Sequence, residues 1–142
     1  MKHPKRAISI RQPWAWAIVH AGKDIENRST RNWTPGPVAI HAAKGMTKLG
    51  YNNAQHMMST IGVKCPPPAD LLRGGIIGTA NISHVISESD SPWFLGPFGL
   101  KLTDAKSVDF IASKGSLGLF SWEASADPEP AEALKWMRKV TG

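Results

Sequence analysis

A short segment near the N-terminus holds the residue types that acid–base chemistry requires. Lys23, Glu26 and Arg28 follow one another within the stretch Lys23–Arg28. A lysine amine that has lost its proton can act as a base, and a nearby carboxylate can polarise a nucleophile. If the protein is an enzyme, we therefore expect Lys23 and Glu26 to be catalytic. Arg28 or Lys44 would then stabilise a developing oxyanion.

Two conditions decide whether Lys23 and Glu26 can act together in catalysis: the pKa of the Lys23 amine and the relative position of the two side chains. Gly22 is predicted to end a helix, and the helix dipole at that end raises the pKa of Lys23. Burial or a neighbouring cation would lower it. The second condition is geometric, because side chains three residues apart on an extended strand point to opposite faces. Lys23 and Glu26 would meet only through a bulge or turn beside Asn27, and otherwise Glu26 pairs with Arg28 on one face.

Arg11 and Gln12 come directly before a predicted helix. The first turn of a helix has free backbone N–H groups and favours anions, and an arginine can add a bidentate contact to a phosphate or carboxylate. An arginine that closes the fold by binding backbone carbonyls is the structural alternative. Both roles stay open for Arg11.

The stretch Ser91–Gly99 alternates turn-forming residues with aromatic ones. In such a loop, Trp93, Phe94 and Phe98 can present flat faces to a nucleobase, a contact worth roughly 1–3 kcal/mol per base, and Trp93 is the preferred candidate. Three other aromatic residues are assigned to packing: Trp14, Trp122 and Trp136.

His41 lies on a predicted strand, where alternation turns it away from the apolar neighbours and toward the Lys23–Arg28 segment if those two strands pair. A hydrogen-bonded structural role is the alternative. No other histidine stands at ligand spacing from it, and the single cysteine, Cys65, excludes an intrachain disulfide. We expect no metal site and no cofactor.

The elements that would position these residues are short. Strands are predicted over 7–10, 38–42, 75–86, 100–103 and 116–122, with an extended stretch over 23–28. Helices are predicted over 13–21, 47–60 and 131–140, and the core of the second is expected to include Leu49, Met57 and Ile61. The pattern has no regular β-α-β alternation, and it predicts a single α+β domain with a mixed barrel or sheet.

The net charge of the chain and the motifs that it lacks limit which classes of function the sequence supports. The 142 residues include 17 Lys and Arg against 11 Asp and Glu, a net charge of +6 that suits phosphate-bearing partners. Neither a dinucleotide-binding nor a triphosphate-binding glycine motif occurs. No apolar run is long enough for a signal peptide or a membrane span, so we expect a cytoplasmic protein with no membrane partner.

Several motifs in a fixed order strongly resemble those of the ASCH domain family, over about residues 7–122. They are Ile8–Ala15, Ala21–Arg28, Gly36–Lys44, Gly75–Gly78, Ser91–Gly99 and Lys114–Phe120. The resemblance implies a PUA-like pseudo-β-barrel of about five to six strands with flanking helices. It also implies a domain over residues 1–125, with a helical extension over 126–142 that packs on the same domain.

The resemblance implies more than one possible activity, because members of the family differ in what they do. Some members of the family look like amidohydrolases that remove the acetyl group from N(4)-acetylcytidine, one is a proposed ribonuclease, and many are presumed RNA-binding modules. In the small deacetylases a threonine stands three residues after the lysine and the catalytic acid is a later glutamate. Here Glu26 takes the threonine position, and Glu88 lies in a different local context from the later acid.

These observations favour a binding module for RNA or a modified nucleoside or nucleotide, with a cationic, aromatic-lined pocket at the end of the barrel. The alternative is an amidohydrolase acting on N(4)-acetylcytidine-type nucleosides through Lys23 and Glu26. Two further readings are RNA cleavage by His41 with Lys23, and an adaptor that docks a protein through Pro66–Pro68 or the final helix. The expected ligand-binding residues are Arg11, Gln12, Asn27, Arg28, His41, Lys44, Trp93 and Phe98.

Overall fold

A six-stranded sheet in the order β2-β5-β4-β3-β1-β6 organises the protein, whose residues 3–138 are described by a computed structural model. The β1–β3 pair is parallel, and the other neighbouring pairs are antiparallel. The strands are β1 (Arg6–Ile10), β2 (Ile25–Arg28), β3 (Gly36–Ala42), β4 (Gly75–Ile86), β5 (Phe98–Ala112) and β6 (Leu119–Ser121).

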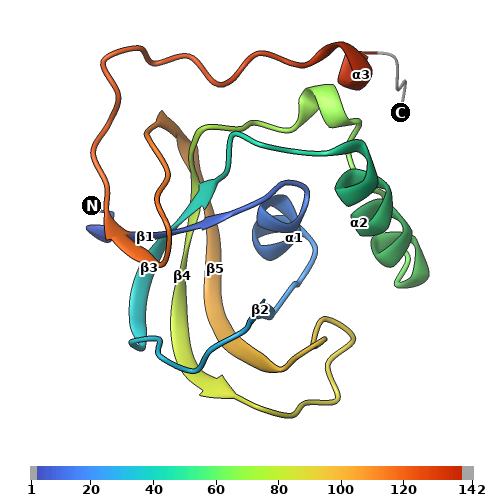
Figure 1. Cartoon of the computed structure of the whole chain (residues 1–142), viewed down its shortest axis with the longest axis vertical. Helices are drawn as coiled ribbons and strands as arrows, with labels where there is room; N and C mark the ends of the chain where they lie inside the picture. The colour runs from blue at the N-terminus through green and yellow to red at the C-terminus, as the bar shows by residue number, and fades with distance from the viewer. Residues whose placement is uncertain (1–2, 139–142) are drawn as a thin grey trace.

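The sheet curls into a half-barrel, so the predicted α+β class and barrel-like shape are confirmed (Figure 1). Register shifts interrupt the β3–β4 and β4–β5 pairs, and such irregularities bend and twist strands locally. Gly75 and Gly78 allow close approach within the curl. A Cβ at Gly75 would lie 2.4 Å from the Ile111 carbonyl oxygen, and one at Gly78 would lie 2.6 Å from that of Lys106.

Helix α1 (Trp14–His20) packs against β3, β4 and β5 inside the curl. It buries Ala15, Ala17 and Ile18, small or branched residues that let the helix approach the sheet closely. The sequence predicted this helix over 13–21, and the structure confirms it. Gly22 follows with a φ of +71°, a left-handed conformation that turns the chain sharply toward β2.

Helix α2 (Lys48–Thr60) lies at one side of the half-barrel (Figure 1). Its predicted core face was wrong at two positions, because Leu49 is 70% exposed and Ile61 is 38% exposed. The helix instead buries Tyr51, Ala54 and Met58, which share one face at helical spacing.

Two strands differ in length from their sequence predictions. β5 continues to Ala112, well past the predicted end at 103, although residues 103–107 are all exposed. Pairing with β4 holds this polar stretch extended, so backbone hydrogen bonds outweigh the missing apolar alternation. β6 is only three residues long because Lys114–Gly118 forms a loop rather than the predicted start of the strand.

The chain after β6 crosses the molecule to α3 (Lys135–Arg138), which packs beside the 3-10 turn η1 (Pro68–Asp70) (Figure 1). The helix was predicted over 131–140, but Leu134 is 50% exposed and outside it, whereas Met137 is fully buried. Val140 lies outside the described residues. No helix within residues 3–138 is long and apolar enough to cross a membrane.

Candidate functional site

A pocket of about 250 Å³ opens between α1, α2, β2 and the loop before β5. We call it the tryptophan pocket, after the two indoles in its wall. Its lining is mainly apolar, with three polar side chains from the segment around β2. The lining residues are Trp14, Lys23, Glu26, Asn27, Met57, Pro92, Trp93 and Leu95.

Trp14 and Trp93 form the aromatic walls of the tryptophan pocket. Their ring centroids are 6.4 Å apart and their planes meet at 87°, an edge-to-face arrangement. Trp93 is only 5% exposed, although the loop that carries it lies at the surface. The two rings are therefore held firmly, and each keeps part of its surface toward the pocket.

Lys23 supplies a buried cation between these rings. Its side chain is 3% exposed, and Nζ lies 5.9 Å from the Trp14 centroid and 6.0 Å from that of Trp93. Nζ donates hydrogen bonds to the Ile25 carbonyl and, over 3.2 Å, to Glu26 Oε1. Burial lowers the pKa of Lys23, and attraction to Glu26 opposes that shift without reversing it. The direction of this shift is the one that burial was expected to produce.

The expectation that Lys23 and Glu26 need a bulge in order to meet was wrong. Strand β2 begins at Ile25, so Lys23 lies before the strand and is not bound by its alternation. The Lys23 amide bonds to the Ala17 carbonyl over 3.1 Å, which turns the residue back against α1. From there its flexible four-carbon stem reaches Glu26.

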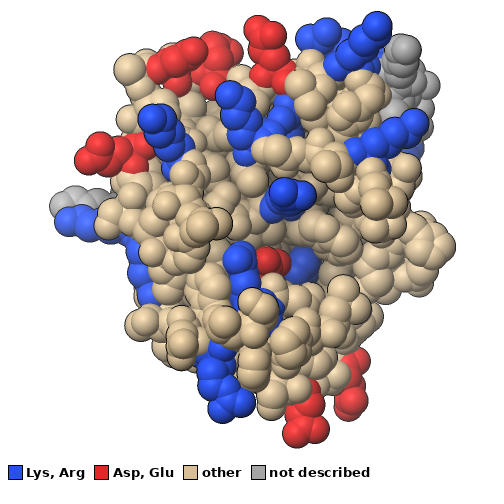
Figure 2. Space-filling view, in the orientation of Figure 1, with Lys and Arg blue, Asp and Glu red and all other residues tan. Residues whose placement is uncertain are grey.

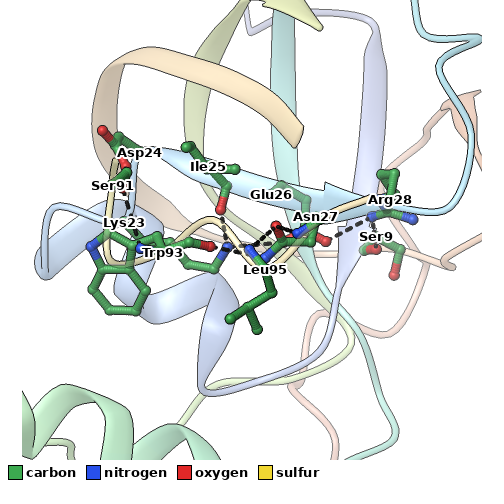
Figure 3. Close-up of polar contacts among 11 residues, drawn as sticks. Ser9, Lys23, Asp24, Ile25, Glu26, Asn27, Arg28, Ser91, Trp93 and Leu95 are labelled. Carbon is green, nitrogen blue, oxygen red and sulfur yellow. Dashed lines mark hydrogen bonds and ion pairs between the residues drawn. The ribbon is translucent and has the colours of Figure 1, made fainter. Parts of the chain in front are cut away.

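Glu26 also pairs with Arg28 on the other side, as alternation along the strand predicted. Arg28 Nη2 lies 3.1 Å from Glu26 Oε2 and 3.4 Å from the Ser9 carbonyl oxygen. The Arg28 guanidinium stacks over Trp33, with 4.8 Å between its carbon and the ring centroid. Figure 3 shows these contacts running along β2 from Lys23 through Glu26 to Arg28. One carboxylate thus joins two cations.

Asn27 fastens the loop that carries Trp93. Its Nδ2 donates to the Trp93 carbonyl over 2.9 Å, and its Oδ1 accepts from the amides of Leu95 and Gly96 over 2.8 and 3.2 Å. Asn27 therefore belongs to the pocket wall and also sets the shape of the loop. At the start of this loop, Ser91 Oγ donates to Asp24 over 2.7 Å.

A second and larger hollow, of about 1330 Å³, lies on the far side of the Glu26–Arg28 pair. We call it the basic hollow. Arg11, Arg28, His41 and Lys44 line it, whereas Lys23, Asn27 and Trp93 line the tryptophan pocket. The structure therefore divides the sequence-predicted site residues between two neighbouring hollows. In Figure 2, Lys and Arg side chains surround a recess near the middle of the face, and a carboxylate is visible inside it.

His41 is 1% exposed and both of its ring nitrogens are engaged. Nε2 lies 2.9 Å from the Ser113 carbonyl oxygen, so this nitrogen carries the hydrogen, and Nδ1 accepts from Ser9 Oγ over 2.9 Å. Burial lowers the pKa of His41, which favours the neutral ring. His41 therefore links three segments at the floor of the basic hollow. It lies in a different hollow from Lys23, and β3 does not pair with β2.

Two other predicted residues make structural contacts. Gln12 is 3% exposed, and its side chain donates to the Leu72 carbonyl over 2.9 Å and accepts from the Trp16 amide over 2.8 Å. It thereby satisfies one of the free amides at the start of α1 that an anion would otherwise take. Phe98 begins β5 and stacks with Arg31, 4.9 Å from the ring centroid, and lines neither hollow.

Sequence reasoning missed four pocket residues. Trp14 was assigned to packing and Met57 to the core, and Pro92 and Leu95 were given no role in a site, yet all four line the tryptophan pocket. The available signal for Trp14 was its place at the start of the short helix that ends just before Lys23. Leu95 is 79% exposed, and an exposed leucine beside Trp93 marks the rim of the pocket.

Within residues 3–138, no three His, Cys, Asp or Glu side chains converge in a way that could hold a metal ion. No protein-family model matches the sequence, and no curated protein matches it either. The polar and aromatic geometry of the two hollows therefore carries the functional argument.

Proposed function

We propose that this protein is a binding module for RNA or a modified nucleoside, and that the tryptophan pocket takes a single base. The observation that carries this proposal is the Lys23–Glu26 pair between two indole rings. The pocket volume of about 250 Å³ is below the range of about 300–1,000 Å³ typical of drug-sized ligands, which suits one small planar group. We also propose membership of the ASCH domain family, which the ordered motifs and the half-barrel support.

The polar groups of the pocket match the edge of a cytosine-like base. Such a base offers an amino group as donor beside ring acceptors. The Glu26 carboxylate can accept from the amino group, while the Lys23 ammonium can donate to a ring acceptor. The indoles supply stacking surface worth roughly 1–3 kcal/mol per base.

Titration of the protein with cytidine, N(4)-acetylcytidine and a short single-stranded RNA tests this function, with tryptophan fluorescence as the signal. We expect saturable quenching, and we expect Lys23→Met to weaken it strongly. Lys106→Met is the matched control, because Lys106 is exposed on β5 and lines neither hollow. The proposal fails if no probe binds at low ionic strength, or if both variants bind as the parent does.

Amide hydrolysis is a second candidate function, favoured by the lowered pKa of Lys23 and its 3.2 Å contact with Glu26. Neutral Lys23 would take a proton from water as the water oxygen attacks the acetyl carbonyl. The carbon–nitrogen bond then breaks, and the departing exocyclic nitrogen receives the proton from Lys23. The products are acetate and cytidine.

Chromatography of N(4)-acetylcytidine incubated with the protein separates binding from hydrolysis. A hydrolase releases cytidine at a rate that rises with pH as Lys23 loses its proton, and Lys23→Met abolishes the release. Saturable binding of N(4)-acetylcytidine with no cytidine formed would leave the binding function in place and exclude hydrolysis of this substrate.

A further inference from the structure

The basic hollow contains more positive charge than its carboxylates neutralise. Its lining carries five basic side chains, from Arg11, Arg28, Lys44, Arg73 and Lys114, and three acidic ones, from Asp127, Glu129 and Glu132. Among the described residues, Arg28 is the only one of these eight that forms an ion pair, and its partner is Glu26. The other four cations have no carboxylate partner in the described part of the chain, so an anion in the hollow would meet uncompensated positive charge.

Arg73 carries one of these positive charges in a buried position, where water screens it poorly. It is 3% exposed, and its guanidinium donates to the backbone carbonyls of Lys44 and Glu132. Carbonyl oxygens satisfy its hydrogen bonds but carry no net charge. Burial lowers the pKa of Arg73, as expected for a cation with no carboxylate partner within residues 3–138. An anion in the hollow would therefore be favoured.

Two buried polar atoms at the wall of the hollow have no hydrogen-bond partner in the described structure. They are Ser113 Oγ, on a residue that is 4% exposed, and Arg28 Nε. Both residues line the basic hollow. Buried polar atoms are almost always paired, so an unpaired hydroxyl and an unpaired guanidinium N–H in two residues that line the hollow favour a ligand with acceptor oxygens.

The loop Lys114–Gly118 adds backbone donors on the same side. All five of its residues line the hollow, and none of their amides donates a hydrogen bond within the part of the chain that the structure describes. Successive free N–H groups in a turn form a recognised type of anion-binding surface. Lys114 at the start of this loop contributes a full charge.

From these observations we propose that the basic hollow is a phosphate subsite, and that the natural ligand is a phosphorylated nucleoside with its base in the tryptophan pocket. This inference rests on the proposed binding function. The two hollows share a wall, because Glu26 lines the tryptophan pocket and Arg28, 3.1 Å away, lines the basic hollow. A base on one side of this wall and its phosphate on the other occupy both hollows at once.

The acidic residues restrict where the phosphate lies. Asp127, Glu129 and Glu132 belong to the segment that crosses the molecule between β6 and α3. In Figure 2, acidic side chains gather along the upper edge, where Figure 1 draws this segment. Repulsion from them favours a phosphate away from this segment, near Arg28 at the wall shared with the tryptophan pocket.

The test compares cytidine, cytidine 5′-monophosphate and a short oligocytidylate by calorimetry in dilute buffer. We expect the monophosphate to bind about tenfold more tightly than cytidine, the worth of one charge-assisted hydrogen bond. The double variant Lys44→Ala/Lys114→Ala should bring this ratio close to one, whereas Lys106→Ala should leave it unchanged. Asp127→Asn should increase the ratio, because it removes a negative charge from the hollow.

Equal affinity for cytidine and its monophosphate in the parent would overturn the phosphate subsite while leaving the base pocket intact. An unchanged ratio in the double variant would overturn it as well.

Titration with pyrophosphate alone separates the two proposals, since binding that the double variant loses supports the subsite even if no nucleoside binds. A monophosphate that matches the oligocytidylate in affinity identifies a free nucleotide as the ligand, and a much tighter oligocytidylate with steeper salt dependence identifies an RNA strand.

Discussion

Replacing Glu26 by glutamine removes the carboxylate that joins Lys23 to Arg28. The Glu26 carboxylate oxygens lie 3.2 Å from Lys23 Nζ and 3.1 Å from Arg28 Nη2, and the Lys23 side chain is only 3% exposed. Removing one partner of a buried ion pair typically costs about 3–5 kcal/mol, because the remaining charge stays buried without compensation. The Glu26 and Arg28 side chains are 14% and 24% exposed, so water moderates the loss. We expect Glu26→Gln to lower the free energy of unfolding at pH 6 by about 3 kcal/mol.

The pH dependence of this loss tests its cause. The pKa of Lys23 in the folded protein is below its unfolded value, and Glu26→Gln lowers it further because an attractive charge is removed. Below the folded pKa, Lys23 is charged in both states and folding bears the full cost of burying that charge. As the pH rises from the folded pKa toward 10.5, folded Lys23 becomes neutral and the cost disappears. The difference between the parent and Glu26→Gln should therefore shrink between pH 6 and pH 10, leaving the part due to Arg28.

Urea unfolding followed by tryptophan fluorescence measures this difference at both pH values. Lys23→Met is the matched control, because it removes the titrating amine and Glu26→Gln in that background should lose its pH dependence. An equal loss of stability at pH 6 and pH 10, or a loss below about 0.5 kcal/mol at pH 6, would refute the assignment of Lys23 as a buried charge held by Glu26.

Two further predictions concern the loop before β5 and the floor of the basic hollow. Asn27→Ala removes three hydrogen bonds to the loop that carries Trp93, and we expect about 2–3 kcal/mol less stability and weaker ligand binding, measured by urea unfolding and titration. Wild-type binding by Asn27→Ala would contradict the positioning role of Asn27. His41 has a folded pKa below 6.5, so stability should fall as the pH drops below 6.5, by at most about 1.4 kcal/mol per pH unit. His41→Asn should flatten that slope in acid unfolding, and an unchanged slope would show that other groups cause it.

Local pattern predicted most of the elements but not their lengths. The start of α1, the apolar run of β3 and the whole of β4 follow from periodicity and turn residues. The second half of β5 could not be predicted in this way. Residues 103–107 are all exposed and four of them are polar, and they are held extended by pairing with β4. That pairing is non-local, so no window of sequence around the strand contains it.

The candidate site was partly predictable for a similar reason. The residue types at Lys23, Glu26 and Trp93 were informative, and alternation gave the Glu26–Arg28 pair. The contact between Lys23 and Glu26 depends on where β2 begins, which alternation alone does not fix. The separation of His41 from Lys23 depends on strand order, because β3 and β2 are not neighbours in the sheet.

The order of the strands also bears on how this protein can diversify. β2 is at one end of the sheet and pairs only with β5 among the described strands. The groups that would choose between ligands, Glu26 and Asn27 together with Leu95 on the adjoining loop, are therefore at the margin of the fold, while α1 and the middle strands hold the main core. Of these three, Leu95 is 79% exposed and its apolar side chain forms no hydrogen bond, so substitutions there can change the rim of the pocket while the Glu26 and Asn27 contacts and that core stay in place.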